Sequence, residues 1–148
     1  FHMRDGYRRY RFPSQKAQYL AGCLAGLADF DEPDDDVELR DALANLPGIG
    51  PKTASWIVRN YRASDRVAVL DVHILRAGRH IGLFDTEHTP LRHYRQLEGA
   101  FLEFAKAIKT AAGMLDGLIW DYMRKMPASR PHSVRGADQP DLFVEVAA

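Results

Sequence analysis

Apolar residues recur at intervals of three and four positions along most of the chain. This spacing is typical of amphipathic helices, whose apolar side chains share one face. The pattern predicts helices over residues 14–30, 37–46, 52–61, 71–80, 90–111 and 112–126. We therefore expect an all-α fold.

Polar segments separate the predicted helices. Ser14 is the expected N-cap of the first helix, and the acidic residues 31–36, which include Pro33, are an expected solvated connection. Residues 67–70 form a short apolar stretch that we expect to be extended or irregular. Three prolines and a glycine mark the last part of the chain, so we divide it into a helical domain, 1–126, and a tail, 127–148.

Composition limits the classes of protein. A hydrophobic content of 46% suits an ordinary buried core rather than a disordered chain. Cys23 is the single cysteine, which excludes an internal disulfide, a four-cysteine iron–sulfur cluster and a cysteine-rich zinc site within this sequence. His88 and His93 show no metal-binding spacing with nearby carboxylates. We expect no metal and no organic cofactor.

The sequence also predicts a protein without a membrane span. No apolar run approaches the roughly 20 residues needed to cross a bilayer. No secretory signal peptide is recognisable, and reduced cysteine chemistry suits an intracellular protein. We expect a cytoplasmic protein, associated with the nucleoid if it binds DNA.

The net charge alone does not show whether the protein binds DNA. Twenty basic and twenty acidic residues give a net charge of +0, whereas proteins that bind DNA usually carry a basic face. The charges are unevenly distributed: residues 4–16 hold five basic side chains, and residues 29–41 hold eight acidic ones. A local basic surface is therefore compatible with the neutral total.

The strongest local motif is LPGIGPKTA at residues 46–54. It predicts two helices joined by a tight hairpin with glycines at positions 48 and 50. Glycines let the backbone approach a phosphate, and the N-terminus of the second helix presents free N–H groups and a positive dipole end. Ile49 would fill the gap between the helices. The hairpin could hold a sugar–phosphate backbone without reading sequence, or it could be only a turn between core helices.

Two residues near the hairpin are candidates for chemistry. Lys52 lies in the first turn of the second hairpin helix, where the dipole disfavours a charged lysine. A neutral lysine can act as an amine nucleophile, although a solvated lysine is the simpler interpretation. Asp71 follows 19 positions later and opens another helix, where an aspartate is also a favoured N-cap.

The hairpin LPGIGPKTA and the later LDVH, at residues 70–73, resemble the helix-hairpin-helix (HhH-GPD) DNA glycosylases, and most closely the 8-oxoguanine DNA glycosylases. The resemblance is specific over residues 43–80 and extends over 7–126. It implies that Lys52 attacks the anomeric carbon of the damaged nucleotide and that Asp71 assists. It also implies DNA-backbone contacts at the positions of the hairpin and the following helix: Gly48, Ile49, Gly50, Thr53, His73 and Arg76.

A later motif suits the pocket of such an enzyme. In LDGLIW, residues 115–120, Asp116 and Trp120 are four positions apart and share a helical face. The carboxylate could accept hydrogen bonds from a flipped purine while the indole stacks on it. Archaeal-type oxoguanine glycosylases show a similar Asp and Trp. The alternative is that Trp120 belongs to the core.

The resemblance predicts a base-excision repair enzyme, a DNA glycosylase with AP lyase activity that removes 8-oxoguanine or a similar oxidised purine from damaged double-stranded DNA. The alternatives are a monofunctional glycosylase, a non-catalytic DNA-binding module, and a repurposed subunit of a defence or repair assembly. The chain begins at Phe1 and has little before residues 7–12, so we expect an N-terminal part of the fold to be missing. A protein partner could bind at that N-terminal edge or at the tail near residues 142–144.

Overall fold

The computed structural model of the chain describes residues 2–3, 6–7 and 12–126, and they form the predicted all-α fold. The strand β1 (His2–Met3) pairs antiparallel with β2 (Gly6–Tyr7). The helices are α1 (Pro13–Ala28), α2 (Asp36–Ala44), α3 (Pro51–Arg62), α4 (Val72–His80), α5 (Pro90–Ala107) and α6 (Ala112–Lys125). Among these residues, no helix is long and apolar enough to cross a membrane. The predicted tail, 127–148, lies outside the described residues.

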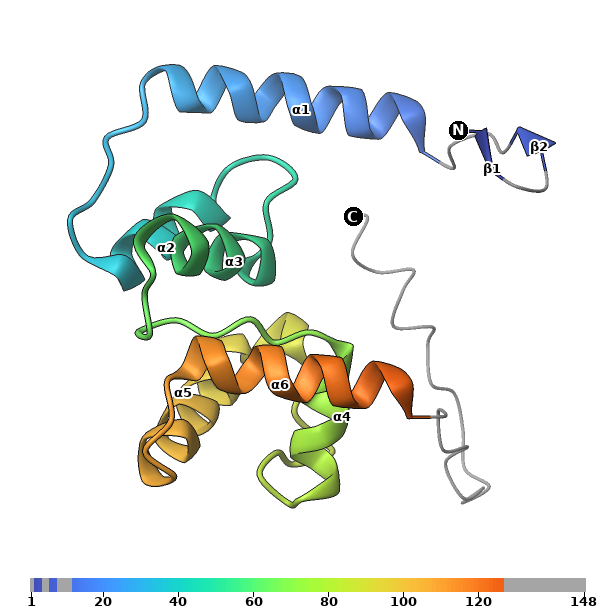
Figure 1. The fold of residues 1–148 in the computed structure, drawn as a ribbon. Helices are drawn as coiled ribbons and strands as arrows, with labels where there is room; N and C mark the ends of the chain where they lie inside the picture. The colour runs from blue at the N-terminus through green and yellow to red at the C-terminus, as the bar shows by residue number, and fades with distance from the viewer. Residues whose placement is uncertain (1, 4–5, 8–11, 127–148) are drawn as a thin grey trace.

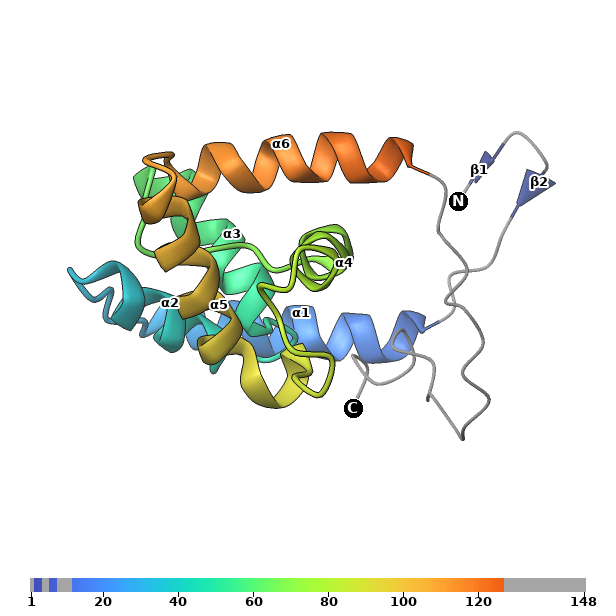
Figure 2. The same ribbon diagram turned by 90° about the horizontal axis from the view of Figure 1, so that it is seen from below.

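The helices pack in two groups. Helices α2 and α3 form the hairpin unit, while α4 and α5 both contact α6 in the second group. Helices α1 and α6 lie on opposite sides of α3 (Figure 1, Figure 2). Side chains of α3, of α6 and from the start of α4 line one shared cavity.

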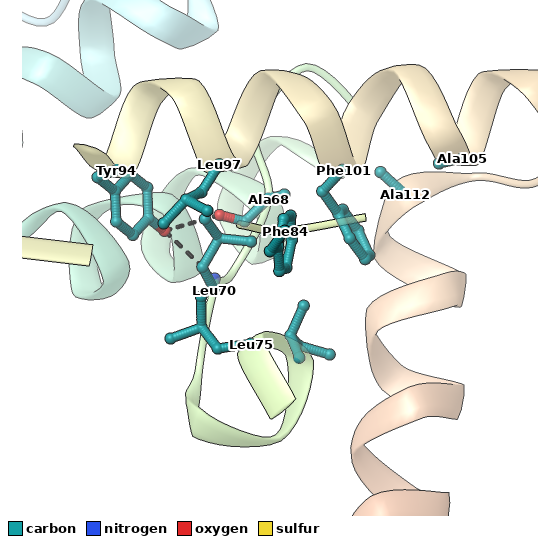
Figure 3. Packing of buried hydrophobic residues seen from close by; sticks show 10 residues of the cluster. Ala68, Leu70, Leu75, Phe84, Tyr94, Leu97, Phe101, Ala105 and Ala112 are labelled. Carbon is teal, nitrogen blue, oxygen red and sulfur yellow. Dashed lines mark hydrogen bonds between the residues drawn. The ribbon is translucent and has the colours of Figure 1, made fainter. Parts of the chain in front are cut away.

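Each group has its own hydrophobic core. The hairpin core consists of Leu39 and Leu43 from α2, Ala54 and Val58 from α3, and Val67 from the following segment. The second core joins the segment before α4 to α4, α5 and the start of α6, and Figure 3 shows its packing. Its buried members are Ala68, Leu70, Ile74, Leu75, Phe84, Tyr94, Leu97, Phe101, Ala105 and Ala112.

A buried polar network joins the two cores. The Arg40 guanidinium of α2 donates to Glu98 of α5 over 2.5 Å, and both side chains are almost fully buried. Glu98 also accepts from the Ala68 backbone N–H at 2.9 Å. The Tyr94 hydroxyl donates to the Ala68 carbonyl at 2.8 Å and accepts from the Leu70 N–H (Figure 3). These bonds fix the extended segment that leads into α4.

The protonation of Tyr94 favours this arrangement. Burial raises the pKa of its hydroxyl to about 12, and the hydrogen bond between Tyr94 and Ser55 opposes that shift only in part. The hydroxyl is therefore neutral near pH 7 and keeps the proton that it donates to Ala68. The expected irregular conformation of residues 67–70 is confirmed, and it is held by side chains rather than by a sheet.

The start of α1 differs from the prediction. The helix begins at Pro13, its N-cap residue is Phe12, and Ser14 lies inside the first turn. Proline is well suited to the first helical position because its φ is already helical and the N–H that it lacks would have no partner there. The expected Ser14 cap is therefore wrong. Helix α5 also ends at Ala107 rather than at the expected residue 111, whereas α6 begins at residue 112 as predicted.

The predicted apolar face of α1 does not enter a core. No residue of α1 is fully buried, and Leu20 and Leu24 are 62% and 60% exposed. The helix instead approaches the hairpin through its glycines: a Cβ added at Gly22 would lie 3.1 Å from the Pro47 ring. Such close backbone approach brings α1 against the hairpin turn and leaves its leucines outside.

Candidate active site

The predicted nucleophile lies at the start of α3. Gly50 is the N-cap of this helix, Pro51 is its first residue, and Lys52 follows in the first turn. Lys52 is exposed and makes no ion pair with any residue that the structure describes. Its side chain lines a cavity, so the amine can reach a ligand bound there.

Asp71 is both an N-cap and part of the cavity. Its Oδ1 accepts hydrogen bonds from the backbone N–H groups of His73 at 2.8 Å and Ile74 at 2.9 Å. Its other oxygen, Oδ2, has no hydrogen-bond partner among the described residues. Asp71 also lines the cavity, so capping by one oxygen leaves the second available to a ligand.

The cavity is formed where α3, α4 and α6 meet, and its volume is about 550 Å³. This is the size of an ordinary small-molecule site and is enough for a nucleobase. It brings together the two predicted catalytic residues and the two predicted pocket residues, although α3 and α6 are far apart in sequence. The lining residues are Lys52, Thr53, Trp56, Arg59, Val69, Asp71, Ile74, Asp116, Gly117 and Trp120.

Asp116 is held in the cavity wall by Arg59. Asp116 is buried, and both of its carboxylate oxygens accept from Arg59 Nη1. Burial raises the pKa of Asp116, the Arg59 charge and hydrogen bond oppose that rise, and the negative charge of Asp71 adds to it. The cavity therefore holds two basic and two acidic side chains, and Arg59 compensates the charge of the buried Asp116.

Two tryptophans supply aromatic surface to the cavity. Trp120 of α6 and Trp56 of α3 are 45% and 54% exposed, so Trp120 is not a core residue. The Arg124 guanidinium lies 4.8 Å from the Trp120 ring centroid, and the His73 ring meets Trp120 edge-on with centroids 6.4 Å apart. These neighbours restrict the Trp120 indole.

Comparison with known proteins gives the same family as the motifs. Residues 3–110 match the family model described as 8-oxoguanine DNA glycosylase. The chain belongs to the 8-oxoguanine DNA glycosylase family. Three relatives carry the name 8-oxoguanine DNA glycosylase/AP lyase: those of Metallosphaera sedula, 33% identical over 120 residues, Saccharolobus islandicus, 32% over 126, and Saccharolobus solfataricus, 31% over 122. No solved structure gives a significant match.

The family match covers most of this chain and part of each relative. The alignments span 75–76% of the chain but only 57–58% of the relatives. The chain thus spans less than three fifths of the length of the glycosylases it matches. Membership of the glycosylase family and its helix-hairpin-helix fold follow from these matches together with the helices described above.

The glycosylase hairpin has the predicted geometry. Gly48 has a φ of +78°, and a Cβ there would lie 2.7 Å from Tyr19, so this position requires glycine. Ile49 packs against the hairpin core as expected. Gly50 has an ordinary φ and open space around it, and Thr53 is exposed on the first turn of α3. Their contacts with DNA remain a prediction.

His73 and Arg76 of α4, which were predicted to bind DNA, contact residues of α6. The Nδ1 atom of His73 is buried without a hydrogen-bond partner in the described structure, beside Trp120. Arg76 donates to the Met123 carbonyl at 2.9 Å, close to the C-terminal end of α6. Both residues therefore join α4 to α6, and their predicted role on the DNA backbone stays a prediction.

Sequence reasoning did not identify Arg59 and Trp56. Trp56 and Arg59 follow Lys52 on α3 by four and seven positions, and this spacing places all three on one helical face. This spacing could have predicted both residues, because they lie on the same face of α3 as Lys52, which lines the cavity. The pairing of Arg59 with Asp116 could not be predicted from the sequence, since it depends on how α3 packs against α6.

The described residues hold no group of three or more histidine, cysteine, aspartate or glutamate side chains placed to bind a metal. His88 and His93 lie near each other, with ring centroids 4.8 Å apart. His93 Nδ1 accepts from the Thr89 N–H at 3.2 Å, within the first turns of α5. This pair is part of the local structure of the helix start.

Proposed function

We propose that this protein is a bifunctional DNA glycosylase and AP lyase that removes an oxidised purine, such as 8-oxoguanine, from double-stranded DNA. The observation that carries the proposal is the cavity in which Lys52 and Asp71 meet Asp116 and Trp120. A lysine amine, a carboxylate and aromatic surface in one cavity suit covalent chemistry on a flipped nucleotide. Such a partner would associate the protein with the nucleoid.

In the proposed reaction, the damaged nucleotide leaves the duplex and its base enters the cavity. Trp120 and Trp56 provide stacking surface on α6 and α3, while the hairpin turn and the α4 N-terminal region hold the flanking backbone. Flipping costs a few kcal/mol of base stacking, which contacts in the pocket must offset. The cavity volume of about 550 Å³ leaves room for a purine and part of its sugar.

The bond changes then follow from the side chains in the cavity. The Lys52 amine, once deprotonated, forms a bond to the anomeric carbon while the bond from that carbon to the base breaks. The base leaves with the electron pair and takes up the proton that the attacking nitrogen loses. The free oxygen of Asp71 stabilises the positive charge that develops on the sugar. Opening of the sugar ring gives a Schiff base, and loss of a C2′ proton then expels the 3′ phosphate by β-elimination.

The test is covalent trapping with borohydride on duplex DNA containing one 8-oxoguanine. We expect an adduct with the unaltered protein and none with Lys52→Gln, because glutamine has no nucleophilic amine. Lys106→Gln is the matched control, since Lys106 is an exposed lysine of α5 that does not line the cavity. Base release without any adduct would indicate a monofunctional glycosylase instead.

A non-catalytic DNA- or protein-binding subunit is the second candidate. Its support is that Asp71 caps α4 and Lys52 is exposed, as each would be in a helical protein without catalytic activity. Such a subunit would bind duplex DNA in a salt-dependent manner, or bind a protein partner, and would release no base. Single-turnover assays for base release therefore distinguish the two candidates.

A further inference from the structure

Arg59 and Asp116 form a charged pair that the proposed bond changes do not use. Both line the cavity, Asp116 is only 4% exposed, and 20% of the Arg59 side chain is exposed. A buried ion pair is weak support for stability, because removing both charges from water offsets most of their attraction. Burial raises the pKa of Asp116, which shows that its environment disfavours the carboxylate. A charged pair that lies in the cavity despite the desolvation cost is a candidate for direct contact with the bound ligand.

The pair retains hydrogen-bonding capacity. A guanidinium has five N–H donors, and Arg59 uses only Nη1 toward Asp116; its Nε and Nη2 have no partner within the described part of the chain. A carboxylate has about four lone-pair sites, so the Asp116 oxygens can accept further bonds while they hold Arg59. Arg59 therefore has unused donors beside the acceptors of Asp116, and both side chains line the cavity.

A donor next to an acceptor matches a lactam edge, in which a carbonyl oxygen stands beside a ring N–H. Guanine has such an edge at O6 and N1–H, and oxidation at C8 adds a second at O8 and N7–H. Adenine presents an amino group beside an unprotonated ring nitrogen, so its amino donors would face the guanidinium donors. An unmatched polar group in a buried site is costly, and the mismatch disfavours adenine.

We propose that Arg59 and Asp116 together determine base specificity, with Arg59 donating to the carbonyl oxygen of an oxopurine and Asp116 accepting from the adjacent ring N–H. The inference rests on the proposed glycosylase function and adds to it the chemical feature of the base that is read. Asp116 alone would not suffice, because without Arg59 its buried carboxylate would lose its compensating charge.

The test compares two DNA substrates, one duplex with 8-oxoguanine and one with an abasic site. The abasic site still reacts with Lys52 under borohydride but has no base to read. For Arg59→Gln and Asp116→Asn we expect single-turnover excision of 8-oxoguanine to slow by about tenfold or more, the effect of one lost charge-assisted hydrogen bond. Trapping at the abasic site should fall less than excision does, because no base is read there.

Arg62→Gln is the matched control. Arg62 is also an arginine of α3, its side chain is also 20% exposed, and it pairs with Glu32 and Asp36 outside the cavity. We expect this variant to keep both activities.

Equal losses on the two substrates in Arg59→Gln and Asp116→Asn would overturn the inference by showing that the pair only maintains the site. Unchanged excision would also overturn it, and an unaltered protein inactive on both substrates would overturn the proposed function itself.

Discussion

At the scale of single residues, one side chain can serve the fold and the chemistry together. Asp71 has an Oδ1 that caps α4 and an Oδ2 that faces no described partner. From the sequence, capping and catalysis were competing interpretations of this aspartate. The structure makes them compatible, because each interpretation needs a different oxygen.

Two substitutions of Asp71 should separate these contributions. Asparagine caps helices about as well as aspartate, so Asp71→Asn should leave the free energy of unfolding nearly unchanged while slowing base release. Asp71→Ala should slow base release and also lower stability by about 1 kcal/mol, because the cap is lost. Urea denaturation and single-turnover excision measure the two effects. Normal excision by Asp71→Asn would reduce Asp71 to a helix cap.

Site residues that depend on contacts between helices were the hardest to predict from the sequence. Lys52, Asp71, Asp116 and Trp120 could be nominated because their local motifs resemble those of a known family. The bond from Arg59 to Asp116 joins positions 57 residues apart, and no periodicity within either helix reveals it. Contacts of this kind depend on how helices pack, which sequence spacing does not specify.

At the scale of elements, the hairpin follows closely from its sequence, whereas α1 does not. The α2 and α3 helices begin and end within about one residue or two of their predicted bounds, because an Asp35 cap, a Gly48 turn and Pro51 are strong local signals. The apolar periodicity of α1 correctly predicted a helix, but none of its residues is fully buried. Periodicity identifies an apolar face and does not show that a partner covers it.

The two hairpin glycines should respond differently to substitution. Gly48→Ala should cost about 1–3 kcal/mol of stability, because alanine at a φ of +78° is strained and its Cβ would meet Tyr19. Gly50→Ala should cost about 1 kcal/mol or less, since Gly50 has an ordinary φ and open space. If a phosphate approaches Gly50, its variant should bind duplex DNA several-fold more weakly. Thermal unfolding and a binding titration check both, and unchanged DNA affinity in Gly50→Ala would contradict this use of the hairpin.

At the scale of the whole molecule, the two cores are joined through buried charge. The Arg40–Glu98 pair links α2 to α5, and Glu98 also holds the segment that leads to Asp71. The site depends on this junction, since Lys52 belongs to the hairpin unit and Asp71 to the second group. The sequence predicted the helices but neither their grouping nor the polar network between the groups, because buried arginine and glutamate resemble surface residues in a sequence.

Removing one member of this pair should therefore destabilise the molecule. Glu98→Ala should lower the free energy of unfolding by about 3–5 kcal/mol, because it leaves the Arg40 charge buried without its partner. Arg95→Ala is the control: Arg95 pairs with Asp41 at 2.6 Å, but its side chain is 74% exposed, and the loss should be below about 1 kcal/mol. Chemical denaturation measures both, and similar small losses would contradict a structural role for the buried pair.

The central claim is that Lys52 is the nucleophile of a base-excision reaction, and identification of the trapped residue tests it most directly. The protein would be reduced with borohydride on 8-oxoguanine DNA, digested, and the modified peptide sequenced by mass spectrometry. The chain has four other lysines: Lys16, Lys106, Lys109 and Lys125. We predict that the deoxyribose remnant is attached to Lys52 alone. Attachment to another lysine, or base release with no modified peptide, would contradict the account.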